Sequence, residues 1–173
     1  FSSACCGGRT QSVADSRSDV TPIPPLAGGV PCACPRIATS YRWKPTRISK
    51  SDLTQRLLKS RPKFSRLGRI ESIEVAETTA WGRPKVLRLQ GSSGDVQKMI
   101  AENFRLAVGS RTIRSTNMRI LNHPEHIEFS RGKGFGHGMG MCQWGMQEMA
   151  LRGATADAII KHYYPTSRLT RAY

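Results

Sequence analysis

Glycine occupies every second position from residue 132 to residue 140, and four different side chains stand between the glycines. In an extended chain successive side chains point to opposite faces, so one face of this segment would be bare backbone. The other face would carry Lys133, Phe135, His137 and Met139. A bare face allows another backbone, or a sugar ring, to approach closely. The pattern favours a groove floor with His137 aimed at a ligand, and the simpler alternative is a glycine-rich loop with a structural histidine.

An amide and an indole follow this segment, at the expected start of a helix. The amide of Gln143 can hydrogen bond hydroxyl groups, and the ring of Trp144 can stack on the face of a sugar, although tryptophan more often packs in a core. No stretch fits the dinucleotide-binding or phosphate-binding loop patterns. We therefore expect a carbohydrate groove lined by His137 and Gln143, with Lys133 and Tyr163 nearby.

Four of the five cysteines lie in the first 34 residues. Four thiolates would suffice for a closed tetrahedral zinc site, which would be structural because no position stays open for a substrate. Their spacing is not a common zinc pattern, and disulfides or reduced, unliganded thiols stay open as alternatives. Cys142 is expected to be a half-buried packing residue. The expected zinc ligands are Cys5, Cys6, Cys32 and Cys34.

The chain is strongly basic, with a net charge of +15 and an isoelectric point near 10.4. The positive residues are spread along the sequence, which suits either a polyanionic partner or a solvated basic surface. Nucleic acid is not expected, because the aromatic-interleaved basic motifs of nucleic-acid-binding domains are missing. Cell-wall polymers are also anionic, so they are a second class of polyanionic partner that this charge would suit.

The order of the expected strands and helices predicts an α+β domain of mixed, mostly antiparallel strands and short helices. Residues 1–40 form a Cys-rich loop region, and residues 41–173 form the main α+β body. Alternating apolar residues predict the strands, and two of them, separated by Gly82-Arg83-Pro84, form a hairpin. The expected strands cover residues 41–48, 69–78, 86–90, 118–121 and 127–129.

Two helices are expected in the first part of this body. One begins after an N-cap at Ser51 and carries an apolar stripe that includes Leu53 and Leu57. The other covers residues 96–108, with Asp95 as its cap.

The C-terminal part is expected to be a two-helix segment after the Gly-rich strand. The first helix covers residues 141–152 and ends at Gly153. Thr155 caps the second helix, which runs to about residue 163. Residues 169–173 are expected to close the fold as a strand.

The glycine-rich segment and its continuation resemble the signature of the SpoIID/LytB family. The family pattern runs Gly-Arg-Gly-x-Gly-His-Gly-x-Gly-x-Ser-Gln-Trp-Gly, followed by Ile-Leu-x-His-Tyr-Tyr-Pro. Residues 132–145 here read Gly-Lys-Gly-Phe-Gly-His-Gly-Met-Gly-Met-Cys-Gln-Trp-Gly, and residues 159–165 read Ile-Ile-Lys-His-Tyr-Tyr-Pro. Residues 113–117 resemble the family's Leu-Arg-Ser element, and residues 3–10 resemble its His-Ser-Thr-Cys-Gly-Gly-x-Thr. Cys142 stands in place of the usual serine.

The resemblance implies a bacterial envelope protein outside the cytoplasm, similar to lytic transglycosylases that act on peptide-free glycan strands in sporulation or wall remodelling. Such an enzyme needs a carboxyl group that stays protonated in a partly apolar site. The family's glutamic acid lies in a Glu-x-Pro segment upstream of Cys-Gly-Gly, so we expect the acid upstream of Phe1 and assign no catalytic residue in this sequence. The alternative is a non-catalytic, wall-binding amidase-enhancer module.

The resemblance also has implications for partners and cofactors. The expected partners are cell-wall glycan and other cell-wall hydrolases, and a membrane anchor in the parent protein is left open. Some family members carry zinc beside the Cys-Gly-Gly element, which agrees with a structural zinc here; no cofactor is expected for catalysis.

Overall fold

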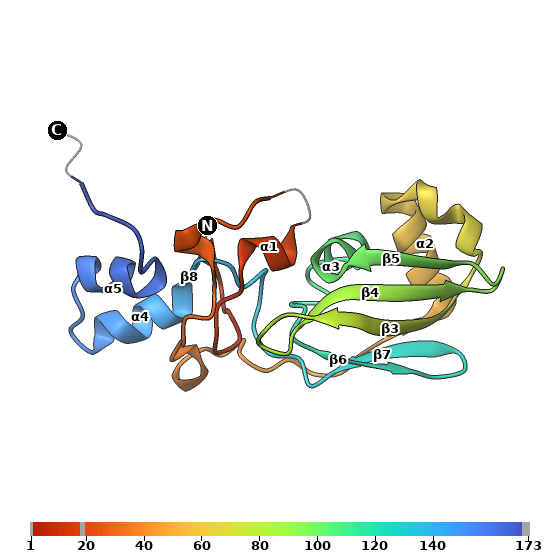
Figure 1. Cartoon of the computed structure of the whole chain (residues 1–173). Helices are drawn as coiled ribbons and strands as arrows, with labels where there is room; N and C mark the ends of the chain where they lie inside the picture. Colours follow the sequence, from red (N-terminus) through yellow and green to blue (C-terminus); the bar gives the residue numbers. More distant parts are fainter. Residues whose placement is uncertain (1, 18–19, 171–173) are drawn as a thin grey trace. The chain divides into compact units, whose positions relative to one another are not determined.

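The computed structural model describes residues 2–17 and 20–170 (Figure 1). The chain divides into two compact units. We call Arg42–Lys133 the central unit, and residues 1–41 together with 134–173 the terminal unit. An N-terminal and a C-terminal segment thus belong to one unit, whereas the sequence predicts residues 134–173 as part of a main body that begins at residue 41. Within the described ranges, no helix is long and apolar enough to cross a membrane.

The central unit contains two antiparallel three-stranded sheets, which confirms the predicted α+β class. The first sheet has the order β3 (Ile70–Thr78), β4 (Pro84–Gly91) and β5 (Val96–Ile100), and β3 and β4 form the predicted hairpin. The second has the order β2 (Thr46–Ser49), β7 (His126–Ser130) and β6 (Arg119–Asn122).

Two helices, α2 (Lys50–Ser60) and α3 (Ala101–Val108), pack against each other, and each also contacts the first sheet. A short 3-10 helix, η3 (Pro62–Leu67), follows α2. The core of the central unit draws side chains from both sheets and both helices, because each element has one apolar face to bury. Its buried members include Leu53, Leu57, Ile73, Leu87, Leu89, Phe104, Ile127 and Phe129.

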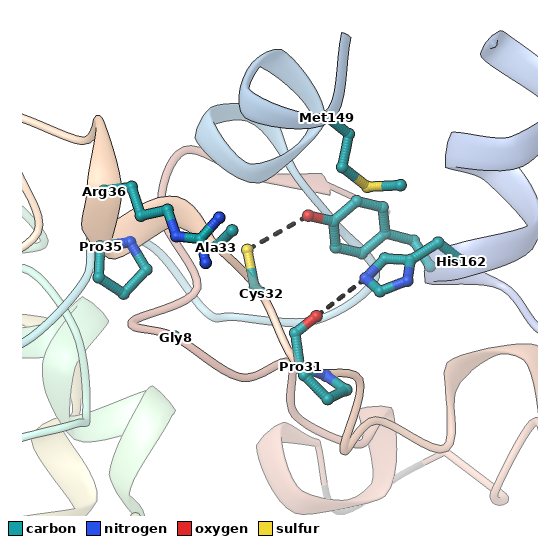
Figure 2. Close-up of a pocket in the computed structure, with 9 residues that line it drawn as sticks. Gly8, Pro31, Cys32, Ala33, Pro35, Arg36, Met149 and His162 are labelled. Atoms are coloured by element: carbon teal, nitrogen blue, oxygen red, sulfur yellow. Dashed lines mark hydrogen bonds between the residues drawn. The ribbon is translucent and has the colours of Figure 1, made fainter. Parts of the chain in front are cut away.

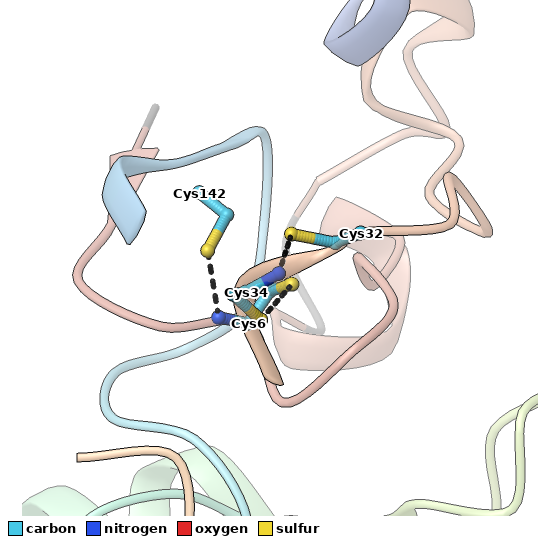
Figure 3. Close-up of side chains that lie close together, drawn as sticks. All are labelled: Cys6, Cys32, Cys34 and Cys142. Atoms are coloured by element: carbon cyan, nitrogen blue, oxygen red, sulfur yellow. Dashed lines mark hydrogen bonds between the residues drawn. The ribbon is translucent and has the colours of Figure 1, made fainter. Parts of the chain in front are cut away.

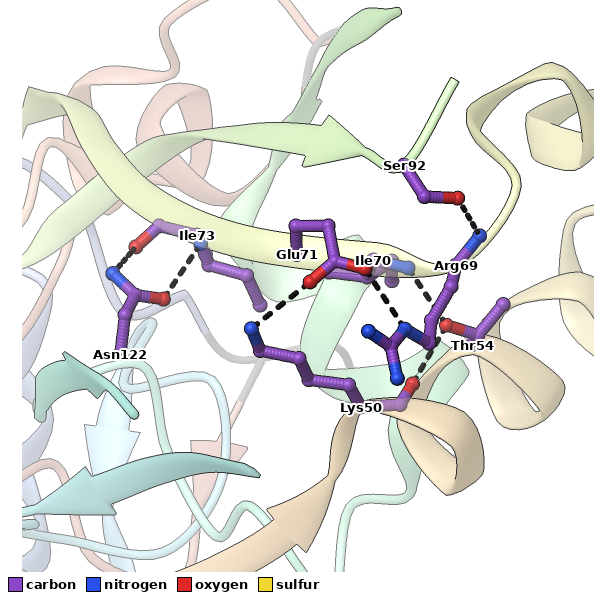
Figure 4. A network of polar contacts seen from close by, with 8 residues as sticks. All are labelled: Lys50, Thr54, Arg69, Ile70, Glu71, Ile73, Ser92 and Asn122. Carbon is purple, nitrogen blue, oxygen red and sulfur yellow. Dashed lines mark hydrogen bonds and ion pairs between the residues drawn. The ribbon is translucent and has the colours of Figure 1, made fainter. Parts of the chain in front are cut away.

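Polar side chains join α2 and β6 to strand β3, which is an edge strand of its sheet (Figure 4). The side-chain amide of Asn122 donates to the Ile73 carbonyl at 3.0 Å, and its oxygen accepts from the Ile73 N–H at 2.9 Å. On the same strand Glu71 accepts from Arg69 Nε at 2.8 Å and from Lys50 Nζ at 3.0 Å. Asn122 therefore satisfies backbone groups of an edge that has no neighbouring strand there.

The prediction of one helix over residues 96–108 is wrong for its first five residues. Val96–Ile100 form β5, which pairs with β4 from Gln90↔Val96 to Val86↔Ile100. Hydrogen bonds to β4 outweigh the local helical pattern, because intrinsic propensity is a weak preference that tertiary context overrides. In α2 the N-cap is Ser49, whose hydroxyl accepts from the Asp52 N–H, and not Ser51 as predicted.

The terminal unit has little regular structure besides two helices near its C-terminus. Strand β1 (Ser2–Ser3) pairs in parallel with β8 (Met141–Cys142), and α4 (Gln143–Leu151) packs on α5 (Ala156–Tyr163). Short elements α1 (Val13–Ser16), η1 (Pro24–Leu26) and η2 (Cys34–Arg36) interrupt the N-terminal loops.

The predicted helix stop after α4 and the predicted N-cap of α5 are both present in the structure. Gly153 follows α4 with a φ of +84°, and the Thr155 hydroxyl caps α5 by accepting from the Ala158 N–H. Leu169 and Thr170 form no strand, and the rest of the strand predicted over 169–173 lies outside the described residues.

The glycine-rich segment is not the regular strand expected from its alternation. Gly134, Gly136 and Gly138 have φ values of +86°, +108° and +80°, which residues with side chains rarely adopt. A Cβ atom at Gly134 would lie 2.7 Å from the Cys5 carbonyl oxygen, and Phe135 makes an isolated bridge to Cys5. The glycines thus allow alternate left-handed residues and close packing of the N-terminal backbone.

Candidate functional site

Four thiols converge in the terminal unit (Figure 3). The Sγ atoms of Cys6, Cys32, Cys34 and Cys142 all lie within 4.8 Å of one another, and the Cys6–Cys34 pair is 3.8 Å apart. A tetrahedral zinc with Zn–S bonds of about 2.3 Å places its sulfurs roughly 3.8 Å apart. All four are free thiols, three of them buried and Cys32 half-buried. The number, type and spacing of the donors therefore fit a zinc ion.

Short backbone elements bring these thiols together. The parallel pairing of β1 with β8 places Cys142 beside the chain that leaves β1, and the Cys6 N–H donates to Cys142 Sγ at 3.3 Å. On the other side Cys34 begins η2, and its N–H donates to Cys32 Sγ at 3.4 Å. Backbone N–H donors favour the thiolate form, which is the form that binds metal.

The set of four differs by one member from the ligands expected from the sequence. Cys142 takes the position that the sequence analysis gave to Cys5. Cys5 lies at the edge of the cluster, with its Sγ 3.6 Å from Cys34 Sγ. The signal that could have found Cys142 was its position in the family motif, where a thiol replaces a serine hydroxyl.

Interactions among the thiols shift their pKa values in opposite directions. The hydrogen bond with Cys32 lowers the pKa of Cys142 to about 3, and the hydrogen bond with Cys142 lowers the pKa of Cys5 to about 3. Hydrogen bonding to Cys142 raises the pKa of Cys6 and of Cys34. A divalent cation bound by these sulfurs would displace the protons of the thiols, because cysteine binds metal as the thiolate.

A pocket of about 500 Å³ opens beside Cys32 (Figure 2). The Tyr163 hydroxyl lies 3.2 Å from Cys32 Sγ, and His162 Nε2 donates to the Pro31 carbonyl at 2.8 Å. Burial raises the pKa of Tyr163, so its hydroxyl stays neutral. The lining residues are Gly8, Pro31, Cys32, Ala33, Pro35, Arg36, Met149, His162 and Tyr163.

Gly145, in the Gln-Trp-Gly part of the motif, lies against this pair. A Cβ atom there would come within 2.1 Å of the Tyr163 hydroxyl and 2.2 Å of Cys32 Sγ. The glycine therefore permits α4 to pack directly on the cysteine cluster.

The residues expected to bind glycan occupy different environments. His137 is half-buried, and its Nδ1 accepts from the Met139 N–H at 3.0 Å, which assigns the proton of the neutral ring to Nε2. Gln143 is exposed at the first residue of α4. Tyr163 is 2% exposed and lines the pocket of Figure 2, which has neither His137 nor Gln143 in its lining. Lys133 belongs to the central unit.

The central unit carries a basic surface made of two pockets that share Arg42. Their volumes are about 410 and 450 Å³, and no acidic residue lines either of them. Arg131 in the second pocket has a φ of +52°. Among the described residues it is the one non-glycine residue with a positive φ. This surface suits anions. We define it by its cationic residues Arg42, Lys44, Arg111, Arg114, Arg119, Arg131 and Lys133.

Two carboxyl groups are buried in the described part of the chain, and each pairs with arginine. Glu102 forms a two-point ion pair with Arg105, at 2.6 and 2.9 Å. Glu148 pairs with Arg36 and Arg152. Both carboxyl groups are thus held in ion pairs within the fold, and neither is placed as the acid of a glycan-cleaving site.

Comparison with known proteins shows similarity to bacterial proteins of two named kinds. The chain is 36% identical over 67 residues to an amidase enhancer of Bacillus subtilis, a match that covers 39% of this chain and 9% of that protein. It is 48% identical over 40 residues to stage II sporulation protein D of the same organism, covering 23% of this chain and 12% of the relative.

A longer match runs along almost the whole chain. An uncharacterized protein of Brachyspira hyodysenteriae is 30% identical over 167 residues, which cover 95% of this chain and 41% of the relative. The chain thus spans less than half the length of the curated relatives it matches. No family model matches it. The local matches support the predicted relationship to the amidase enhancer and to stage II sporulation protein D.

Proposed function

We propose that this chain is part of a SpoIID/LytB-type protein that acts outside the bacterial cytoplasm and binds cell-wall glycan. The observation that carries the proposal is the pair of local similarities, to an amidase enhancer and to stage II sporulation protein D. The terminal unit supplies the shared motif from Gly134 onward, and the basic surface of the central unit supplies charge for an anionic wall polymer.

In this proposal the terminal unit recognises sugar hydroxyls. The Met139 N–H donates to Nδ1 of His137 and so orients the ring that we assign to glycan contact. The exposed Gln143 amide can both donate to and accept from hydroxyl groups. Tyr163 acts indirectly, because it is buried and supports the wall of the pocket beside Cys32.

Glycan cleavage in the whole protein is proposed to follow lytic transglycosylase chemistry. An acid protonates the glycosidic oxygen as the glycosidic bond breaks, and the 6-hydroxyl of the muramic acid attacks the anomeric carbon to close an anhydro ring. The proton of that hydroxyl passes to the carboxylate that the acid has become. We assign the acid to the family's Glu-x-Pro segment outside residues 1–173, because both buried carboxyls of the described chain are paired with arginine.

A digestion assay on peptide-free glycan strands tests both parts of this proposal. We expect the 173-residue chain to bind the strands without producing anhydro-ended products. Anhydro-ended products from this chain would place the acid within it. Absence of binding to the strands would contradict the proposed recognition.

The second candidate is a non-catalytic module that stimulates a cell-wall amidase. It is favoured by the match to an amidase enhancer, which covers 39% of this chain. If it holds, adding the chain to purified cell walls should increase the rate at which an amidase releases peptides, with no anhydro-ended glycan formed. An unchanged amidase rate would exclude it.

We also propose that Cys6, Cys32, Cys34 and Cys142 hold a structural zinc. The spacing of their sulfurs and the backbone N–H donors to two of them support this assignment. Zinc would tie η2, the chain after β1 and the start of α4 together, in a unit with little regular structure of its own.

A further inference from the structure

The turn between β6 and β7 in the central unit places two histidines side by side. His123 follows β6 and His126 begins β7, and the His123 N–H donates to the His126 carbonyl at 2.9 Å. Their rings are stacked, with centroids 4.4 Å apart and an interplanar angle of 13°. The hairpin therefore fixes the two imidazoles against each other.

The Nε2 atoms of both rings are buried and have no hydrogen-bond partner in the described structure. A buried polar nitrogen without a partner costs free energy, so two such atoms in one place require an explanation. A bound ion is one of the recognised explanations for such groups.

Glu128 supplies a third group at the same place. It lies two residues beyond His126 on β7, so the two side chains leave the same face of the strand. One carboxylate oxygen of Glu128 and one ring nitrogen of each histidine lie within 4.8 Å of one another.

A neighbouring strand holds this carboxylate in position. Arg47 on β2 is the register partner of Glu128, and its Nε donates to Glu128 Oε2 at 2.8 Å. Oε1 then remains for a ligand bond, and the arginine acts as an outer partner that orients the carboxylate.

We propose that His123, His126 and Glu128 form a binding site for a divalent transition-metal ion, separate from the cysteine cluster. Two imidazoles and one carboxylate suit borderline cations such as Zn²⁺, Co²⁺ or Ni²⁺, whereas a site for Mg²⁺ or Ca²⁺ would be built from oxygen ligands. Three protein ligands leave at least one coordination position for water or for an oxygen of another molecule.

Titration of the whole chain with Co²⁺ tests the site against the cysteine cluster. We expect two ions per chain, one of which produces the thiolate charge-transfer band of the cysteines. The variant with His123→Gln and His126→Gln should bind one ion and keep that band, and circular dichroism checks its fold. Two ions bound by this variant, or a single ion bound by the wild-type chain that produces the thiolate band, would overturn the proposal.

A second measurement does not depend on that variant folding. The ring nitrogens of the four histidines are followed by NMR as Zn²⁺ is added to the wild-type chain. We expect large shifts of the Nε2 signals of His123 and His126, and no such shift for His162, whose Nε2 is bonded to Pro31. Unmoved His123 and His126 signals, or binding weaker than about 1 mM, would overturn the site.

Substitution of Arg47, which orients Glu128, and of Glu128 itself should weaken metal binding to different degrees. Arg47→Gln should weaken Co²⁺ binding at the histidine site by roughly 10- to 100-fold, as loss of an outer-shell partner does, and Glu128→Gln should weaken it more. Arg88→Gln, which removes a cation that pairs with Glu74 on the other sheet, should leave the affinity unchanged. Equal affinities in all three variants would contradict the role of Glu128 as a ligand.

Discussion

At the scale of single residues, Cys142 shows how a small change in a motif can alter chemistry. The SpoIID/LytB pattern has serine at this position. The Cys142 thiol lies within 4.8 Å of three other thiols and joins a donor set that fits zinc. Whether Cys142 or Cys5 is the fourth zinc ligand can be tested by substitution. The two residues form a matched pair, because both are buried and both lie close to Cys34.

We expect Cys142→Ser to lose bound zinc and to lower the thermal midpoint, because loss of a structural metal removes its binding free energy from folding. Cys5→Ser is the matched control and should retain one zinc per chain. Elemental analysis after dialysis and thermal unfolding by circular dichroism provide the two measurements. Zinc retained by the first variant and lost by the second would show that Cys5 is the ligand, as the sequence predicts.

His137 and Gln143 are the residues for which glycan contact is proposed. His137→Ala and Gln143→Ala should each weaken binding to peptide-free glycan by roughly 3- to 10-fold, since one hydrogen bond contributes about 0.5–1.5 kcal/mol. Gln147→Ala, exposed one turn further along α4, is the control and should bind as the wild type does. Binding curves from co-sedimentation with the glycan decide between these outcomes, and equal affinities would remove both residues from the site.

At the scale of elements, the side chain of Asn122 makes hydrogen bonds that a neighbouring strand would otherwise make to the edge of β3. Asn122 bonds both backbone groups of Ile73 on the edge of the first sheet, and so joins the two sheets of the central unit. Three residues earlier on the same strand, Ile70 receives a comparable contact from α2, where the Thr54 hydroxyl accepts from its N–H at 2.9 Å. The edge of β3 is thus covered by polar groups of neighbouring elements.

Asn122→Ala should destabilise the protein by about 1–3 kcal/mol, because it removes two hydrogen bonds and leaves backbone groups of Ile73 without them. Gln97→Ala, an exposed position on β5, should change the free energy of unfolding by less than about 0.5 kcal/mol. Urea denaturation measures both values. Similar midpoints for the two variants would mean that water replaces the amide without cost.

At the scale of the whole molecule, part of the excess of positive charge lines two pockets of the central unit. The net charge of +15 includes the seven cations of the basic surface, and the two pockets there have no acidic lining residue. Several positive groups around a hollow attract a polyanion more strongly than the same charges spread over the surface.

The variant with Arg119→Gln and Arg131→Gln should bind an anionic wall polymer several-fold more weakly at low salt and should show a smaller dependence on salt concentration. Lys98→Gln, an exposed cation on β5, serves as the single-charge control and should bind nearly as the wild type does. Binding is measured at two salt concentrations. An equal loss in the control would show that net charge, and not this surface, determines the affinity.

Local signals were reliable where the structure depends on near neighbours. Leu53 and Leu57 recur at helical spacing and are buried along α2, and Thr155 caps α5 through its own side chain. The alternation in residues 69–90 likewise predicts the β3–β4 hairpin. These features depend on periodicity, capping and turns, which involve residues only a few positions apart.

The sequence by itself thus determined the α+β class, most of the elements and the motif that connects the chain to cell-wall proteins. Only the tertiary structure decided that Val96–Ile100 pair with β4, that Cys142 joins Cys6 at the thiol cluster, and that His123 and His126 stack beside Glu128. Each of these depends on groups that the fold brings together, from distant segments or around a particular turn. Local periodicity carries no information about such contacts, because their free energy arises only when the chain has folded.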